Sequence, residues 1–171
     1  MRPSLVLAVA ALPALVAATG FEGIGFPAAA QAEGLLEGGL DVFILETFQD
    51  LTEILAALRA IKAVTAEVPV IAQMTFGLDG KTRYGHGPSL VVRALKQAGA
   101  DVVGVNCGVG PQPLLEVIEE VLAAAEGTPV SAMPNAGLPQ FVEGRYVYLA
   151  SPQYFAEFAA RAVEMGVRIV G

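Results

Sequence analysis

The stretch Gly99-Ala-Asp-Val-Val-Gly-Val-Asn-Cys-Gly-Val-Gly-Pro-Gln-Pro113 decides the interpretation of the fold. Its first half is a short apolar run bounded by glycine, which is typical of a strand buried on both faces of a parallel sheet. Pro111 and the apolar spacing after it predict that a helix follows. The single cysteine, Cys107, then lies where the strand ends, the usual place for chemistry in α/β folds. The alternative is that Cys107 is a small buried apolar residue.

The alternation of strand and helix recurs along the chain. Gly38, Gly99 and Gly166 each begin a helix-to-strand junction of nearly the same sequence. Such a repeat predicts right-handed βαβ units in a parallel sheet. A longer loop is expected to carry Tyr146 and Tyr148. We expect strands over residues 41–46, 68–75, 101–106, 128–133 and 167–170, and helices over residues 29–37, 50–65, 89–98, 114–125 and 152–165.

An open doubly wound sheet and a (β/α)8 barrel both fit this alternation. No Gly-rich phosphate-binding fingerprint follows a predicted strand, which disfavours the dinucleotide-binding open sheet. Polar residues recur where the strands end, as at the carboxyl-terminal rim of a barrel: Glu46, Thr75, Asn106 with Cys107, and Asn135. The predicted fold class is therefore α/β, a partial (β/α)8 TIM barrel with about six of eight strands, counting one near Leu5.

Composition limits the classes of function. A length of 171 residues favours one domain, and 54% hydrophobic residues suffice for a core. The net charge of -7, without a Lys/Arg cluster, disfavours a nucleic-acid partner. One cysteine excludes an intrachain disulfide and fits a reducing cytoplasm.

Residues 1–30 form a divergent N-terminal segment. Arg2 and the apolar, Ala-rich run through Ala18 are similar to a secretory signal peptide. The alternative is a buried barrel strand over residues 5–10 followed by an irregular loop. The run is too short and too rich in alanine to predict a membrane span.

Four motifs occur in order along the rest of the chain: DVFILETF at residues 41–48, GVNCGVGP at 104–111, PVSAMPNAGLP at 129–139 and GVRIVG at 166–171. Together they resemble the homocysteine S-methyltransferase domain, a zinc-dependent (β/α)8 barrel. The resemblance covers residues 31–171. It is closest to a bacterial type that also carries a methylenetetrahydrofolate reductase half, including GRYVYLASP at 144–152.

The resemblance implies an enzyme that transfers a methyl group to homocysteine and forms methionine. Cys107 matches a zinc ligand, and a zinc-bound substrate sulfur loses its proton near neutral pH. Glu46 matches the residue that binds the homocysteine ammonium group. Its alternative role is a carboxylate favoured at a helix N-terminus. Asn106 and Asn135 are expected to bind substrate or, equally, to stabilise turns. His86 is expected to be structural.

The partners follow from the same resemblance. Homocysteine is the methyl acceptor, and the donor is 5-methyltetrahydrofolate or S-methylmethionine. FAD is expected only if the full protein has a reductase half. This chemistry is cytoplasmic, so it favours a barrel strand over a signal peptide near the N-terminus.

Departures from the family pattern lead to a further expectation. The other two zinc ligands of the family are a Cys-Cys pair after the last strand, and this pair does not occur in the chain. The first two strands are also missing. We therefore expect a barrel truncated at both ends that is inactive alone. The alternatives are a non-enzymatic fragment that associates with other chains, for example as a homo-oligomer, or an unrelated α/β enzyme that uses Cys107 or Glu46.

Overall fold

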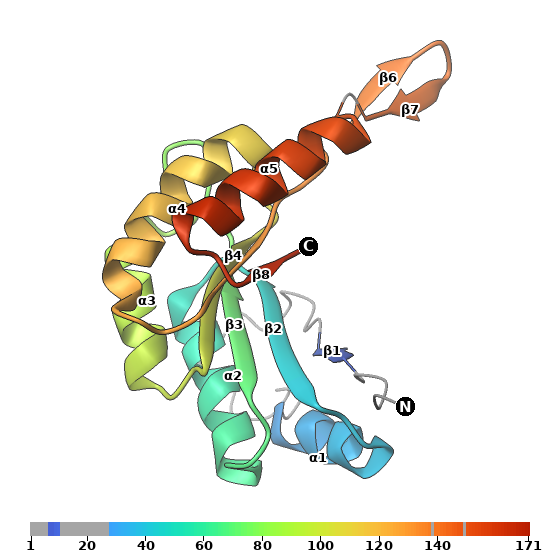
Figure 1. Cartoon of the computed structure of the whole chain (residues 1–171). Helices are drawn as coiled ribbons and strands as arrows, with labels where there is room; N and C mark the ends of the chain where they lie inside the picture. The colour runs from blue at the N-terminus through green and yellow to red at the C-terminus, as the bar shows by residue number, and fades with distance from the viewer. Residues whose placement is uncertain (1–6, 11–27, 138, 149) are drawn as a thin grey trace, which may run out of the picture.

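The centre of the structure, a computed structural model, is a parallel sheet of six strands in the order β1-β2-β3-β4-β5-β8. The structure describes residues 7–10, 28–137, 139–148 and 150–171. The strands are β1 (Leu7–Ala10), β2 (Val42–Phe48), β3 (Val70–Met74), β4 (Val102–Asn106), β5 (Val130–Met133) and β8 (Ile169–Val170). The helices are α1 (Ala28–Gly38), α2 (Leu51–Val64), α3 (Pro88–Gln97), α4 (Pro111–Ala125) and α5 (Pro152–Met165). The predicted alternation is thus observed (Figure 1).

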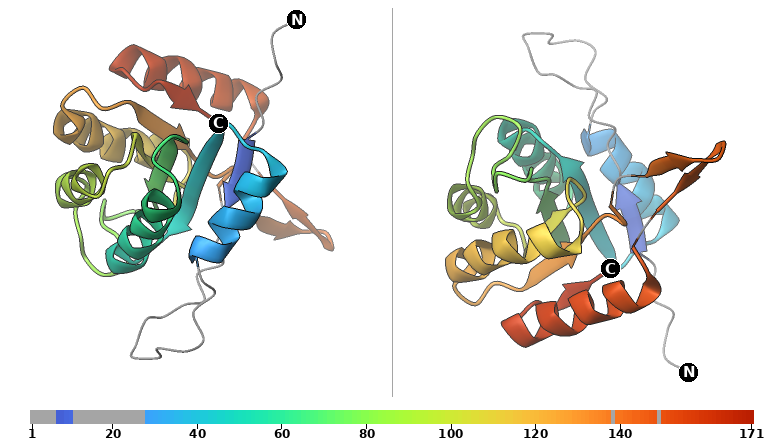
Figure 2. Two further views of the ribbon diagram at one scale, coloured as in Figure 1. Left: turned by 90° about the horizontal axis from the view of Figure 1, so that it is seen from below. Right: turned by 90° about the horizontal axis from the view of Figure 1, so that it is seen from above.

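The helices lie in an arc along one side of the sheet (Figure 2). Alternate strand residues face these helices, as the two-residue period of a strand requires. Phe43, Leu45 and their counterparts on the other strands form one buried cluster with apolar helix residues. The main core therefore lies between the sheet and the helices, as in a segment of a (β/α)8 barrel.

The opposite face of the sheet carries a buried polar pair. Gln73 and Ser131 are both 0% exposed, and Gln73 Nε2 donates to Ser131 Oγ at 3.0 Å. This bond crosses over β4 at Gly104, where an added Cβ would lie 1.9 Å from Ser131 Oγ. Gly104 therefore leaves the space through which the two side chains meet. Gln73 Oε1 is buried without a hydrogen-bond partner.

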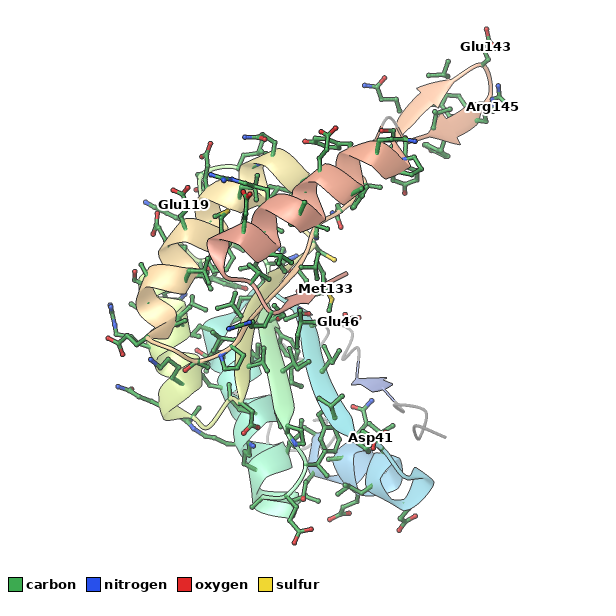
Figure 3. All side chains as sticks on the ribbon, viewed as in Figure 1. Asp41, Glu46, Glu119, Met133, Glu143 and Arg145 are labelled. Carbon is green, nitrogen blue, oxygen red and sulfur yellow. The ribbon has the colours of Figure 1, made fainter. Side chains whose placement is uncertain are left out.

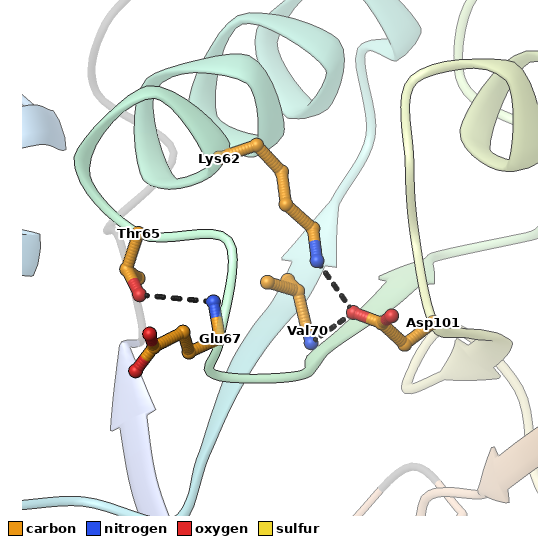
Figure 4. A network of polar contacts seen from close by, with 5 residues as sticks. All are labelled: Lys62, Thr65, Glu67, Val70 and Asp101. Atoms are coloured by element: carbon orange, nitrogen blue, oxygen red, sulfur yellow. Dashed lines mark hydrogen bonds and ion pairs between the residues drawn. The ribbon is translucent and has the colours of Figure 1, made fainter.

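The two ends of β2 are chemically different. Asp41 precedes the strand, and Glu46 lies near its carboxyl end (Figure 3). At the amino-terminal edge, Asp101 joins two neighbouring strands and a helix: its Oδ2 accepts from Val70 N at 2.8 Å and from Lys62 Nζ at 2.6 Å (Figure 4). Because Asp101 N also donates to Val70 O, the start of β4 is fixed to the start of β3.

One part of the chain differs from the prediction. The expected loop around Tyr146 and Tyr148 contains a hairpin of β6 (Gln140–Val142) and β7 (Arg145–Val147), which projects away from the sheet (Figure 1). Glu143 and Gly144 both have positive φ, as the type I′ turn of a two-residue hairpin requires. The rings of Phe141 and Tyr146 pack 5.1 Å apart, yet both residues are more than half exposed. The hairpin has no buried face, so the sequence lacked the alternation that marks a strand.

The predicted strand over residues 5–10 falls partly outside the described residues. Leu7–Ala10 forms β1 and pairs in parallel with β2. Among the described residues, no helix is long and apolar enough to cross a membrane.

Candidate functional site

The candidate site lies where β2, β3, β4 and β5 end at their carboxyl edge. In parallel sheets of this kind, loops at this edge carry the functional residues. Glu46 and Asn106 belong to the last residues of their strands, whereas Cys107 and Asn135 lie just beyond β4 and β5. The predicted residues therefore come from β2, β4 and β5 or the loops that follow them, with β3 between β2 and β4.

A β-bulge shapes the end of β2. Leu45 pairs with Ala72 and Phe48 pairs with Met74, so β2 has one residue more than β3 over this interval. The extra residue lies at Glu46 and Thr47, and Thr47 adopts a left-handed conformation with φ of 65°. Because of the bulge, Phe48 returns to the helix-facing core that also contains Leu45. Glu46 remains half-buried, and no side-chain hydrogen bond or ion pair joins it to another described residue.

The amide of Asn106 organises the centre of the site. Asn106 is 3% exposed. Its Oδ1 accepts from Thr47 N at 2.9 Å, and its Nδ2 donates to Thr47 Oγ1 at 2.9 Å and to Cys107 Sγ at 3.4 Å. Thr47 Oγ1 and Cys107 Sγ are 3.6 Å apart. Asn106 therefore connects the bulge of β2 to the cysteine that follows β4.

The backbone around Cys107 is held in an unusual conformation. Cys107 has φ of 56°, and its N–H donates to Met133 O at 3.0 Å. Thr75 Oγ1 donates to Asn106 O at 3.0 Å, which connects the end of β3 to the same turn. Non-glycine residues with positive φ are uncommon, and they cluster at functional sites when the surroundings hold them there. The Cys107 side chain is left partly exposed at the rim.

Asn135 joins the site through its backbone only. Its N–H donates to Val109 O at 3.0 Å, which holds the loop after β5 against the loop after β4. The Asn135 side chain is half-buried and forms no hydrogen bond with other described residues. The structure therefore brings Asn106 and Cys107 into direct contact, but it does not join Glu46 or Asn135 to them by a side-chain bond.

The described residues fit one position of a zinc site, not a whole site. Cys107 Sγ is accessible at the rim and already accepts a polar contact from Asn106. No group of three or more His, Cys, Asp and Glu residues that could hold a metal occurs among the residues described. His86 is a loop residue with a buried Nδ1 that has no partner, and it belongs to no such group. A single thiolate does not form a zinc site.

A cleft of about 290 Å³ is lined by Thr75 and by Gly108, the residue that follows Cys107. Its cations, Lys81 and Arg83, come from the loop after β3. The local sequence gives no sign that these two cations share a cleft. The bulge residue Thr47 and the buried Gln73 were also missed. The residues that line the cleft are Gln49, Thr75, Phe76, Gly77, Asp79, Lys81, Thr82, Arg83 and Gly108.

Comparison with solved structures defines the fold class. The homocysteine methyltransferase MmuM from Escherichia coli matches with a TM-score of 0.58 at 20% identity, over 88% of this chain and 54% of that one. The carboxyl transferase domain of Rhizobium etli pyruvate carboxylase also has a TM-score of 0.58, at 16% identity, over 84% of this chain and 23% of that one. These likenesses concern the fold, and they confirm the partial TIM barrel.

The family follows from the sequence comparisons. The model of the homocysteine S-methyltransferase family matches residues 27–171, and the chain belongs to this family. Methionine synthase from Mycobacterium tuberculosis is 34% identical over 145 residues, which are 82% of this chain and 12% of that protein. Betaine–homocysteine S-methyltransferase 1 from Rattus norvegicus is 29% identical over 157 residues, 82% of this chain and 38% of that protein. The chain thus spans well under half of the length of these relatives, and the resemblance found in the four motifs is confirmed.

Proposed function

We propose that this chain forms part of an enzyme that transfers a methyl group to the sulfur of homocysteine and so produces methionine. In this reaction a carbon–sulfur bond forms to the methyl group, the donor loses that group, and the thiol proton is released. The observation that carries the proposal is the contact of Asn106 with Thr47 and Cys107 at the carboxyl edge of the sheet, in a chain of this family.

Glu46 is proposed to bind the ammonium group of homocysteine. Its carboxylate is half-buried and has no bonded partner among the described side chains, so it is available to a cation. The alternative role at a helix N-terminus is less favourable, because α2 begins at Leu51 and Asp50 is its N-cap. Helix-dipole effects fall off within the first turn. A charge-assisted contact to an ammonium group would also orient the amino acid.

Cys107 is proposed to be one ligand of a zinc ion. When bound, zinc acts as a Lewis acid that favours the thiolate form of a coordinated thiol. The described residues contain no group of three or more His, Cys, Asp and Glu residues that would complete such a site with Cys107. The contribution of this chain is to hold Cys107 Sγ at the rim, through the Asn106 amide and the backbone bond to Met133.

The two asparagines are proposed to have different roles. Both hydrogens of Asn106 Nδ2 already have acceptors, and only Oδ1 retains a free lone pair for substrate. Asn106 is therefore chiefly a positioning residue. The Asn135 amide has no protein partner among the described residues, which supports a direct contact with substrate.

A second candidate function is a non-enzymatic association with other chains. It is favoured by the sheet order, in which β1 and β8 are the terminal strands among the described residues. Unpaired strand edges are ready templates for pairing. Family membership gives no support to an unrelated α/β enzyme. The cytoplasmic location stays a prediction.

Calorimetric binding of homocysteine, with zinc present, tests the main proposal. The comparison ligand is 4-mercaptobutanoate, which has the thiol and carboxylate but lacks the ammonium group. We expect the chain to prefer homocysteine, and Glu46→Gln to reduce that preference about 10-fold or more, as for a charged hydrogen bond. The matched control is Glu119→Gln, an exposed residue on α4 (Figure 3).

Each alternative outcome has a defined meaning. A folded chain that binds neither thiol overturns the proposal and leaves the association hypothesis. Binding without a preference for homocysteine, or an equal effect of both substitutions, overturns the role of Glu46. Where added zinc strengthens homocysteine binding, Cys107→Ser should abolish that gain, and a gain retained in Cys107→Ser overturns the metal role of Cys107.

A further inference from the structure

The hairpin of β6 and β7 belongs to an arm, residues 139–148, that the rest of the described chain leaves uncovered. β6 and β7 make a separate two-stranded sheet and pack chiefly against each other. The arm points away from the parallel sheet and its helices (Figure 1). A hairpin of two strands without further packing is at best marginally stable in water. The arm is therefore a part of the fold that a partner would stabilise.

One face of the arm is aromatic. Phe141 and Tyr146 are direct cross-strand partners, so their side chains lie on the same face, and their ring centres are 5.1 Å apart. Tyr148 follows two residues after Tyr146, which is the spacing that repeats on one face of a strand. The exposed fractions are 67% for Phe141, 72% for Tyr146 and 56% for Tyr148. These three residues form the aromatic face of the arm, and aromatic side chains gathered in solvent mark an interaction surface.

The charges of the arm favour a second copy of this chain as the partner. The arm carries one carboxylate, Glu143, and one guanidinium, Arg145, which cancel, whereas the net charge of the whole chain is -7. Both residues lie toward the outer end of the arm (Figure 3), and neither forms an ion pair with another described residue. In a two-fold contact both subunits present the same residues, so a surface with one charge of each sign is complementary to itself. A partner with charges of only one sign would oppose one of these two groups.

Contact through the arms also keeps the acidic surfaces of two copies apart. Exposed carboxylates gather on the helices, for example Glu116, Glu119 and Glu120 on α4, and two such helix faces repel each other. The arms project from the helices, so their outer ends can meet without this repulsion. Three largely exposed aromatic side chains on each subunit would bury on the order of 1,000 Å² in total, the low end of specific interfaces. The expected dimer is therefore weak and depends on concentration.

We propose that two copies of this chain associate through their arms in a two-fold contact. The aromatic faces pack together, and the Glu143 and Arg145 charges of one arm meet the opposite charges of the other. This association does not depend on the proposed reaction. It also differs from pairing at the sheet edges β1 and β8, because β6 and β7 belong to a separate sheet.

Analytical ultracentrifugation of the full chain over a range of concentrations measures the association. We expect the parent chain to dimerise as its concentration rises. Phe141→Ser/Tyr146→Ser disrupts the aromatic face, and the Kd of its dimer should rise about 10-fold or more, because aromatic anchors carry much of the binding energy of an interface. The matched control is Leu78→Ser/Tyr84→Ser, which removes two exposed apolar side chains from the loop after β3 and should leave the Kd within about twofold.

Charge reversal tests whether the partner is a second copy. Glu143→Lys makes both charges of the arm positive, and Arg145→Glu makes both negative. Each variant alone sets like charges against each other, so the Kd of its dimer should rise about 10-fold. A mixture of equal amounts of the two variants should regain at least the parent affinity, because arms of opposite charge then meet. The control pair, Glu119→Lys and Arg59→Glu, changes the net charge equally at exposed positions outside the arm, and its mixture should show no such gain.

Three results would overturn the proposal. The first is a parent chain that stays monomeric up to its highest soluble concentration. The second is a dimer that Phe141→Ser/Tyr146→Ser leaves unchanged, which would point to the sheet edges at β1 and β8 instead. The third is a mixture of the charge variants that associates no better than each variant alone, which would exclude a two-fold contact between arms. Thermal unfolding checks that every variant is folded, which is expected because the substituted side chains lie outside the buried core.

Discussion

Asn106 binds Thr47 through both polar atoms of its side-chain amide: Oδ1 accepts from Thr47 N and Nδ2 donates to Thr47 Oγ1, each at 2.9 Å. One bond satisfies the backbone N–H of a β-branched residue with φ of 65°, a conformation that such residues rarely adopt. The bulge at the end of β2 therefore depends on a side chain of β4. This relationship makes Asn106 a structural residue of the site as well as a neighbour of Cys107.

Replacing Asn106 should destabilise the protein. Asn106→Ala removes the bonds to Thr47 and leaves the Thr47 N–H without its partner, and we expect the free energy of unfolding to fall by about 2–3 kcal/mol. Asn135→Ala is the control, because the Asn135 side chain forms no hydrogen bond with described residues, and it should cost less than about 1 kcal/mol. Urea unfolding followed by circular dichroism measures both. Equal losses would show that the amide bonds do not hold the bulge.

At the amino-terminal edge of the sheet, Asp101 should stabilise the fold chiefly through its hydrogen bond from Val70 N and not through its ion pair with Lys62. Asp101→Ala removes the acceptor of Val70 N–H and should cost about 1–3 kcal/mol. Lys62→Met removes only the partly exposed pair with Asp101 and should cost less than about 1 kcal/mol. The midpoints of urea unfolding compare the two variants. A larger loss for Lys62→Met would refute this ranking.

Replacing Gly108 by alanine should cost more stability than its left-handed conformation alone explains, because the glycine is closely packed. Gly108 and Gly80 have similar φ values, 73° and 69°. An added Cβ at Gly108 would lie 2.2 Å from Phe76 O, whereas at Gly80 it meets nothing within 4 Å. Gly80→Ala should therefore cost only the left-handed penalty of about 1–2 kcal/mol. Gly108→Ala must also displace backbone and should cost at least about 2 kcal/mol more. Thermal or urea unfolding of the pair measures the difference, and similar losses would count against this packing.

The fold could be predicted from the sequence because its strands and helices repeat apolar residues at regular spacings. Buried parallel strands and one-sided helices leave apolar patterns, and strand ends such as Asn106-Cys107 mark the functional edge. The hairpin around Tyr146 left no such pattern, because it buries neither face. Its turn signal, Glu143-Gly144, lacks the Asn or Asp that usually precedes glycine in this turn.

The missed parts of the site depend on contacts between strands. Nothing in the local sequence shows that Thr47 forms a bulge, because a bulge is a difference in length between paired strands. The bond between Gln73 and Ser131 likewise requires strands β3 and β5 to lie on either side of Gly104. Such relationships appear only once the register is known.

Glu53, in the first turn of α2, should make the stability of the protein depend on pH. Burial and, to a lesser degree, the nearby Asp50 raise the pKa of Glu53 above its usual value of 4.5. The folded state therefore binds this proton more tightly than the unfolded state. The stabilising contribution of this bound proton is complete below about pH 4.5 and is lost as the pH rises through the raised pKa of Glu53.

Removing the Glu53 charge should consequently raise the stability of the protein only above the raised pKa of Glu53. Glu53→Gln should raise Tm slightly relative to the parent chain at about pH 7, by about 0.5 kcal/mol or less in stability because the side chain is largely solvated. The gain should shrink at about pH 4, where Glu53 is protonated in the folded parent. Glu120→Gln, an exposed residue on α4, controls for the change in net charge. Thermal unfolding at both pH values gives the comparison, and a gain that grows toward low pH would contradict the raised pKa of Glu53.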